Sequence, residues 1–169
     1  DTKQRSYSDL NDEISIHTGG ISTSAVITSH YENIHDFHVY FTVEGKALYG
    51  NIPELLSYMK EMLTETVYDN PVRLKEILLK QKSTMESRFV DRGHAVAVKR
   101  ASSYFSEIGM AMELMDGIAY YEFIAELLAH YEERKDDLIS KLTKVQECFF
   151  AKDCLQMSVT ADAEGYRLV

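Results

Sequence analysis

The densest group of side chains that could bind a metal lies between residues 30 and 38. It contains three histidines and two acids: His30, Glu32, His35, Asp36 and His38. Helical zinc sites place their ligands one turn apart, as in H-E-x-x-H and H-x-x-E-H, and neither spacing occurs in this sequence. The group falls in a short polar connection, where Asn, Asp and His are common turn residues. We therefore predict surface turn residues here, and we assign no metal ligand and no catalytic residue.

Other motifs for nucleophilic or phosphate chemistry are incomplete. There is no Gly-x-Ser-x-Gly sequence, and Thr18-Gly19-Gly20 lacks both the third glycine and the Lys-Ser/Thr pair of phosphate-binding loops. Cys148 and Cys154 have no further Cys or nearby His to complete a zinc pattern. Cys148 lies in an apolar helical stripe and Cys154 lies next to a predicted strand, so we expect core cysteines in a reducing compartment.

Composition indicates one soluble domain over residues 1–169. The chain is 45% hydrophobic and 27% charged, and 18 basic against 27 acidic residues give a net charge of −9. A negative chain repels nucleic-acid phosphates and anionic membranes, so we predict neither as a partner. No apolar run approaches the roughly 20 residues of a membrane span. The polar start without a Met leads us to expect a piece of a longer protein, from a bacterial cytoplasm or an organelle matrix.

The N-terminal third has the period of β-strands. Residues 37–43 alternate apolar and polar side chains, and residues 21–28 do the same more weakly. The connection between them is short and polar, which predicts an antiparallel hairpin. Gly19-Gly20 precedes the first strand and suits a kink after a short helix over residues 6–16. We expect Phe37, Val39, Phe41 and Val43 to face a core.

Helical periodicity then replaces the alternation. Asn51 and Asn70 each precede a helix as a potential N-cap with proline close behind, which predicts helices over 52–67 and 71–89. Apolar stripes predict further helices over 95–105, 121–131 and 138–149, with a looser segment between Gly109 and Gly117. The alternation of Leu155, Met157 and Val159 predicts a closing strand. The expected fold class is α+β, an antiparallel sheet with several helices packed on one face.

Several segments together resemble one peptidase family. The sequence is similar to the presequence-protease (falcilysin-like) branch of the pitrilysin/insulinase zinc metallopeptidases along nearly its whole length. The segments that carry the resemblance are Tyr7-Ser8-Asp9-Leu10, Ile14 to Ile21, Gly93-His94, Arg100 to Phe105 and Gly117 to Tyr121. The resemblance implies the third of four homologous α+β domains, in the C-terminal half of a clamshell, without the first strand or strands and helix of that domain.

The same resemblance implies where the chemistry of such enzymes resides. Their zinc ligands belong to an H-x-x-E-H helix and a downstream glutamate in the first domain, and a substrate-polarising Arg and Tyr belong to the last domain. None of these positions matches a residue of this chain, so no catalytic residue and no cofactor is carried over. Zinc is expected in the parent enzyme only, and the parent is expected to be a zinc metalloendopeptidase.

The leading hypothesis is a non-catalytic structural domain that helps to enclose an oligopeptide in a degradation chamber. Its partners would be the remaining domains of the parent peptidase and the peptide substrate. Substrate contact is predicted for four side chains on the polar strand faces: Ser22, Ser24, Tyr40 and Thr42. The alternatives are a stand-alone acidic protein-interaction domain without activity and a small hydrolase with a site built from distant residues.

Overall fold

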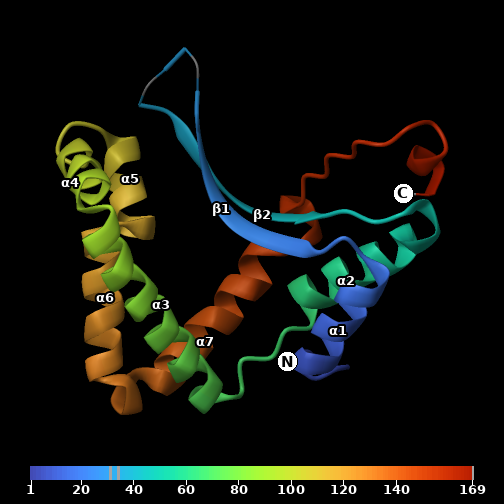
Figure 1. The fold of residues 1–169 in the computed structure, drawn as a ribbon, viewed down its shortest axis with the longest axis horizontal. Helices are drawn as coiled ribbons and strands as arrows, with labels where there is room; N and C mark the ends of the chain where they lie inside the picture. The colour runs from blue at the N-terminus through green and yellow to red at the C-terminus, as the bar shows by residue number, and fades with distance from the viewer. Residues whose placement is uncertain (31, 34, 169) are drawn as a thin grey trace. The chain divides into compact units, whose positions relative to one another are not determined.

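The computed structural model describes residues 1–30, 32–33 and 35–168 (Figure 1). Over these residues the chain is α+β, as the sequence predicts. Seven α-helices and a two-stranded antiparallel sheet are present in these described ranges. The elements are α1 (Tyr7–His17), β1 (Ile21–Ser29), β2 (Phe37–Gly45), α2 (Ile52–Thr64), α3 (Pro71–Asp91), α4 (Gly93–Ser102), α5 (Glu107–Asp116), α6 (Ile118–Ala129) and α7 (Tyr131–Phe149). Short 3-10 turns form η1 (Tyr49–Asn51), η2 (Lys152–Cys154) and η3 (Gly165–Leu168).

The chain divides into two compact units. The first comprises Asp1–Ser24, Phe41–Asp69 and Leu138–Val169, and the second comprises Ala25–Tyr40 and Asn70–Asp137. Each unit has a small apolar core of its own. The buried apolar residues are Leu10, Ile52, Leu55 and Tyr58 in the first unit, and Met85, Ile124, Leu127 and Tyr131 in the second. Four large buried side chains per unit is a small number, so polar contacts have a large share in holding each unit together.

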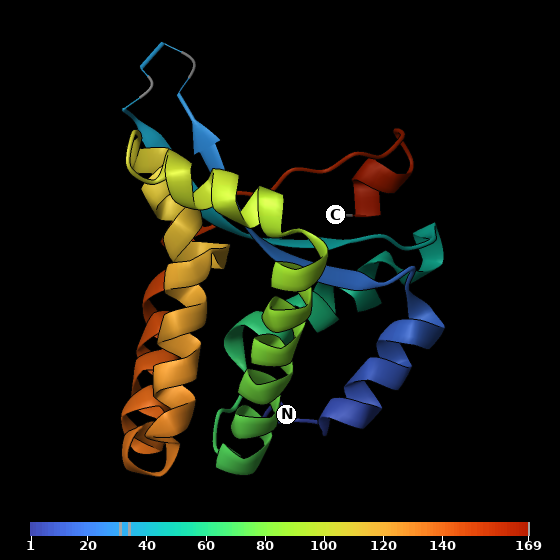
Figure 2. The ribbon, with the colours of Figure 1, turned by 60° about the vertical axis from the view of Figure 1, so that its left-hand side comes forward.

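Helices α1 and α2 lie side by side in the first unit and are joined by side-chain hydrogen bonds (Figures 1 and 2). Ser6 caps α1 by accepting from the Asp9 N–H at 3.2 Å. Asn51 makes no capping hydrogen bond in α2. Its amide instead donates to the His17 carbonyl at 2.7 Å, which satisfies one of the free carbonyls at the end of α1. The predicted Asn51 cap is therefore replaced by a tie between two helices.

The second unit is built from helices that follow one another closely. Contacts join α3 to α4 and α6, and α5 to α4 and α6. Asn70 caps α3 as predicted, accepting from the Arg73 N–H at 3.0 Å. The Tyr131 hydroxyl donates to the Pro71 carbonyl at 2.5 Å and holds the start of α7 against the start of α3.

Three sequence-based predictions of local structure are wrong. The segment from Gly109 to Gly117 belongs mostly to α5, which Ser106 caps by accepting from the Gly109 N–H at 2.9 Å. Residues 155–160 are not a strand, because no neighbouring strand pairs with them. Cys148 and Cys154 are exposed rather than buried.

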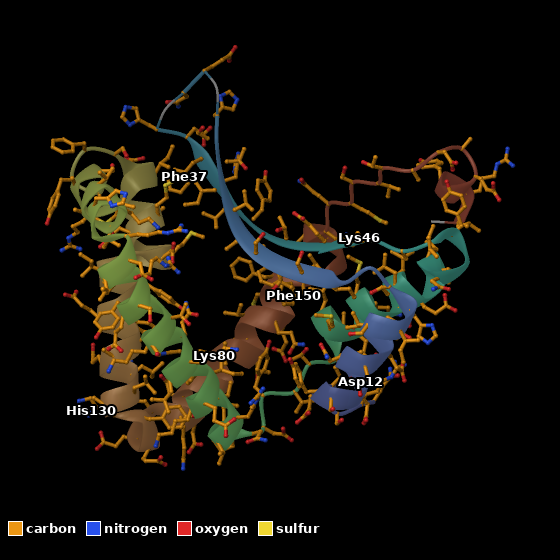
Figure 3. All side chains as sticks on the ribbon, viewed as in Figure 1. Asp12, Phe37, Lys46, Lys80, His130 and Phe150 are labelled. Atoms are coloured by element: carbon orange, nitrogen blue, oxygen red, sulfur yellow. The ribbon has the colours of Figure 1, made fainter. Side chains whose placement is uncertain are left out.

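The hairpin is present with nearly the predicted bounds, but its apolar residues are not uniformly buried. Val39 and Phe41 are 52% and 51% exposed, whereas Phe37 and Val43 are partly buried. In the first unit, the Phe41 ring packs on Phe150, with 5.2 Å between the ring centroids. Phe150 is labelled in Figure 3. Strict alternation therefore identifies the strand correctly, although it does not show what covers each face.

The Thr18-Gly19-Gly20 sequence joins α1 to β1. The Thr18 hydroxyl donates to the Ile14 carbonyl at 2.6 Å and accepts from the Gly20 N–H at 3.0 Å. The Gly19 N–H donates to the Lys46 carbonyl at 2.7 Å. Gly20 has φ = 104°, a conformation that side chains with a Cβ rarely adopt. These contacts show a structural junction rather than a ligand loop.

Replacing Gly20 by Val should destabilise the first unit. A β-branched residue at this φ costs about 2 kcal/mol of unfolding free energy, although the space around a new Cβ is open. Gly50 also has open space but no positive φ, so Gly50→Val is the matched control and should change stability by less than about 0.5 kcal/mol. Urea unfolding followed by circular dichroism measures both, and equal effects would contradict the role of φ.

Candidate functional site

The predicted substrate-contact residues lie on the hairpin, and two of them are joined. The Ser24 and Thr42 hydroxyl oxygens are 2.7 Å apart across the strands. The Thr42 hydroxyl also lies 3.2 Å from the Ser24 carbonyl and donates to it. Because the Thr42 hydroxyl hydrogen is donated to the Ser24 carbonyl, the Ser24 hydroxyl is the donor between the two side chains. The Ser24 hydroxyl oxygen can then still accept a hydrogen bond. The pair therefore presents an acceptor suited to a backbone N–H.

The other two predicted contact residues are exposed on the same strands. Ser22 lies two residues before Ser24, and Tyr40 two residues before Thr42, so strand alternation places each on the same side of its strand as its neighbour. The Tyr40 side chain is 39% exposed, and its ring lies 6.0 Å from that of His38. The arrangement offers hydroxyl groups on a strand surface.

The histidines of the hairpin connection have turn contacts, as predicted. The His30 Nδ1 accepts from the Glu32 N–H at 3.3 Å, and the Asn33 side chain accepts from the His35 N–H at 3.1 Å. The His30 N–H donates to the Asp36 carbonyl at 2.9 Å and closes the loop. Tyr31 and Ile34 of this connection lie outside the described residues.

The second unit contains a buried carboxylate. Glu113 on α5 is 1% exposed. Its Oε1 accepts from Arg100 of α4 at 3.0 Å and from the Ala119 N–H at 3.1 Å, at the start of α6. The free N–H groups at a helix N-terminus favour a negative charge. Glu113 therefore caps α6, which begins after Gly117 and has no capping side chain of its own.

Gly117 is the residue that lets this carboxylate approach. A Cβ at position 117 would overlap the Glu113 carboxylate and would lie 2.7 Å from the Glu113 carbonyl oxygen. The second carboxylate oxygen, Oε2, is buried without a hydrogen-bond partner among the described residues. Oε1 accepts two hydrogen bonds, and Oε2 is enclosed by the protein. Glu113 therefore has the structural role of a helix cap.

Asp116 forms a second ionic junction one turn further along α5. Its carboxylate pairs with Arg88 of α3 and, at 2.8 Å, with Lys99 of α4. Burial alone raises the pKa of this carboxyl, but the hydrogen bonds and charges of Lys99 and Arg88 outweigh it and hold the pKa below its ordinary value. The ion pairs with the two cations therefore stabilise the fold at pH values above the ordinary pKa of an aspartate. This stabilisation is lost as the pH falls through the lowered pKa of Asp116.

The first unit contains a similar arrangement around Glu61 of α2. Glu61 is 3% exposed, accepts from the Thr2 hydroxyl at 2.5 Å and pairs with Arg5 at 3.6 Å. Arg5 also pairs with Glu13 of α1 and lies over the Tyr58 ring, 5.3 Å from its centroid. In the second unit Arg100 likewise lies 5.7 Å from the centroid of Tyr104. Each unit thus combines a buried glutamate with an arginine that also covers a tyrosine ring.

A cleft of about 350 Å³ lies in the first unit. Its lining includes Leu63, Tyr68, Thr143, Gln146 and Phe150. Two of its polar side chains are already bonded, because Gln146 donates to the Leu63 carbonyl at 3.1 Å and Thr143 to the Ile139 carbonyl at 3.0 Å. Burial raises the pKa of the Tyr68 hydroxyl.

A bound metal ion needs several donor side chains around one point. In the part of the chain that the structure describes, no three His, Cys, Asp or Glu side chains are placed to hold a metal ion. The paired acids Glu113 and Asp116 are each bonded to cationic side chains instead. These described residues do not fit a zinc site.

The glutamate junctions were not predicted from the sequence. The apolar periodicity is compatible with either a buried or an exposed side chain at Glu61 and at Glu113. Periodicity alone therefore does not identify these two acids as buried. One local signal was available for Glu113. A helix that starts after glycine has no side-chain cap, and a glutamate four residues before that glycine lies one turn away and reaches the free N–H groups.

The chain folds as an α+β domain, and it belongs to the family described as peptidase M-16C associated. The model of this family matches residues 1–127. Among curated proteins, the mitochondrial presequence proteases of Yarrowia lipolytica and Saccharomyces cerevisiae are both 28% identical to this chain. The two alignments cover 98% and 96% of the chain. Protein HypA of Clostridium perfringens is 28% identical over 98% of the chain. The resemblance to the presequence-protease branch is confirmed.

The chain spans only 17–18% of the length of these relatives. No helix within the described residues is both long and apolar enough to cross a membrane.

Removing the Glu113 carboxylate should strongly destabilise the second unit. Glu113→Ala leaves Arg100 and the start of α6 without their acceptor, and loss of one partner of a buried pair costs about 3 kcal/mol. Glu126→Ala is the matched control, because Glu126 also pairs with an arginine, Arg134 at 3.1 Å, but is 67% exposed. It should cost less than about 0.5 kcal/mol. Chemical unfolding monitored by hydrogen exchange of α4 to α6 distinguishes them, and similar losses would refute the cap.

Proposed function

We propose that residues 1–169 form one non-catalytic structural domain of a zinc-dependent oligopeptidase, a domain that helps to form a closed peptide-degradation chamber. The observation that carries the proposal is the alignment of nearly the whole chain with about a sixth of each presequence protease. The parent enzyme would hold zinc outside this segment. The domain would act through its surfaces, in the matrix of an organelle or in a bacterial cytoplasm.

Exposed apolar side chains support a role within a larger protein. Phe105 is 87% exposed just after α4, Val90 is 85% exposed on α3 and Leu48 is 81% exposed after β2. Single exposed apolar residues are common on protein surfaces, and contact with other protein would remove these large side chains from water. The remaining domains of the parent peptidase are the partners we propose for these surfaces.

The hairpin is a second, independent reason to propose that this domain lies within a larger protein. A two-stranded sheet is marginally stable alone, and β1 carries neither a charged residue nor a proline along its nine residues. Natural edge strands usually carry such residues to prevent pairing with other chains. An edge without them suits a strand that lies inside a larger assembly, next to an extended peptide or another part of the parent.

Charge supports a peptide as the enclosed substrate. Both compact units carry a net negative formal charge, and a negative wall attracts basic peptides. The free acceptor on Ser24, with exposed Ser22 and Tyr40 and the bonded Thr42, would meet backbone N–H groups of an extended peptide. We propose these four side chains as substrate contacts.

The non-catalytic role has a direct test. The purified 169-residue chain should retain less than about 0.1 equivalent of zinc after dialysis, since it lacks the spacing of a helical zinc site, and should not cleave basic peptides. One equivalent of zinc that is lost in His30→Ala or His35→Ala, or peptide cleavage by the chain, would overturn it. The gene sequence on both sides of this segment distinguishes the proposal from the alternative, which is a stand-alone acidic protein-interaction domain. An upstream H-x-x-E-H helix favours the proposal.

The chamber role predicts which strand face meets the peptide. A photo-crosslinker at position 22 of the full-length protein should capture a bound basic peptide, whereas one at Thr23 should not, because neighbouring residues of a strand point to opposite faces. Both positions are exposed in the structure, which makes them a matched pair. Equal capture from both positions, or capture from Thr23 alone, would refute contact through the Ser22 face while leaving the non-catalytic role intact.

A further inference from the structure

The two cysteines lie close together at the end of α7. Cys148 is in the last turn of this helix, and Cys154 ends the short η2 turn that follows. The Cys154 N–H donates to the Ala151 carbonyl at 3.0 Å, so the chain turns back on itself. As a result the Cys154 Sγ lies 3.9 Å from the Cys148 carbonyl oxygen. Both thiols are free and exposed.

Simple geometry limits how far apart the two cysteines can be. A carbonyl oxygen lies about 2.4 Å from the Cα of its own residue, and a cysteine Sγ lies about 2.8 Å from its own Cα. With the 3.9 Å between the Cys154 Sγ and the Cys148 carbonyl oxygen, the two Cα atoms are at most about 9 Å apart, whereas a disulfide requires roughly 4.4–6.8 Å. Both side chains are exposed, so rotation about their side-chain bonds meets little steric resistance. Rotation of the two side chains, together with movement of the short segment between them, brings the sulfurs together.

We propose that Cys148 and Cys154 form a reversible thiol–disulfide pair, a modification site that is oxidised by a low-molecular-weight disulfide such as glutathione disulfide. One cysteine thiolate attacks glutathione disulfide, forms a mixed disulfide and releases one glutathione thiolate. The second cysteine thiolate then attacks the protein sulfur of that mixed disulfide and expels the second glutathione. The two thiol protons end on the two released glutathione molecules, and the two cysteines are oxidised by two electrons.

The position of the pair determines what oxidation would change. Phe150 lies between the cysteines in sequence and packs on Phe41 of β2, and Gln146 holds α7 to the Leu63 carbonyl. A bond between residues 148 and 154 would therefore fix the start of the C-terminal segment to an anchored helix end. An exposed disulfide that closes so short a loop is readily reduced, as expected for a reversible site rather than a permanent crosslink.

Treatment of the reduced protein with glutathione disulfide tests the proposal. Intact mass should fall by two hydrogen atoms, with no retained glutathione and no dimer on a non-reducing gel. Trypsin cleaves the sequence after residue 152, so the peptides 145–152 and 153–167 should appear joined and should separate on reduction. Mixed disulfides that persist on both cysteines, or a disulfide between two copies of the chain, would overturn the proposal.

Single variants provide the control. Cys148→Ser and Cys154→Ser keep one thiol each and lack the second attacking group, so each should retain a glutathione adduct. The adduct in the wild-type protein should be lower by at least about tenfold, because the neighbouring thiol acts at a high effective concentration. Unchanged circular dichroism shows that both variants are folded. Equal adduct levels in wild-type and variant proteins would show that the two thiols do not react with each other.

Discussion

The packing of helices in the second unit depends on one buried carboxylate at a helix start. Glu113 lies where α4, α5 and α6 meet, and it is bonded to an arginine of one helix and to a backbone N–H of another. The unit buries only a few large apolar side chains, so hydrophobic contact alone leaves the relative rotation of these short helices weakly determined. A charged group with two fixed partners defines that geometry, because any shift leaves a buried charge without compensation.

The same solution is used twice in the chain. In the first unit Glu61 is buried beside Thr2 and Arg5, which connects the N-terminal segment with α2. In both units the arginine also covers a tyrosine ring, Tyr58 in one and Tyr104 in the other. The guanidinium group thereby remains partly hydrated on one side while it neutralises a carboxylate on the other. Such pairs specify one arrangement of helices where an apolar interface alone permits several.

Elements with strong local signals could be predicted from the sequence. Proline after Asn51 and Asn70 marked the starts of α2 and α3, and alternation marked both strands. Predictions failed where contacts between residues far apart in the sequence determine the local structure or the exposure of a side chain. The Leu155 to Val159 segment alternates like a strand but has no pairing partner, and the exposure of Phe41 depends on what lies beyond the hairpin. The hydroxyl pair of Ser24 and Thr42 requires the cross-strand register, which sequence alternation does not supply.

The start of α6 has a consequence for the dynamics of the domain. Gly117 offers no side chain to the first turn of α6, so that turn depends on a carboxylate from the preceding helix. If α5 frays, α6 loses its cap at the same moment, and the charge of Arg100 is released as well. The three helices therefore open as a single cooperative segment.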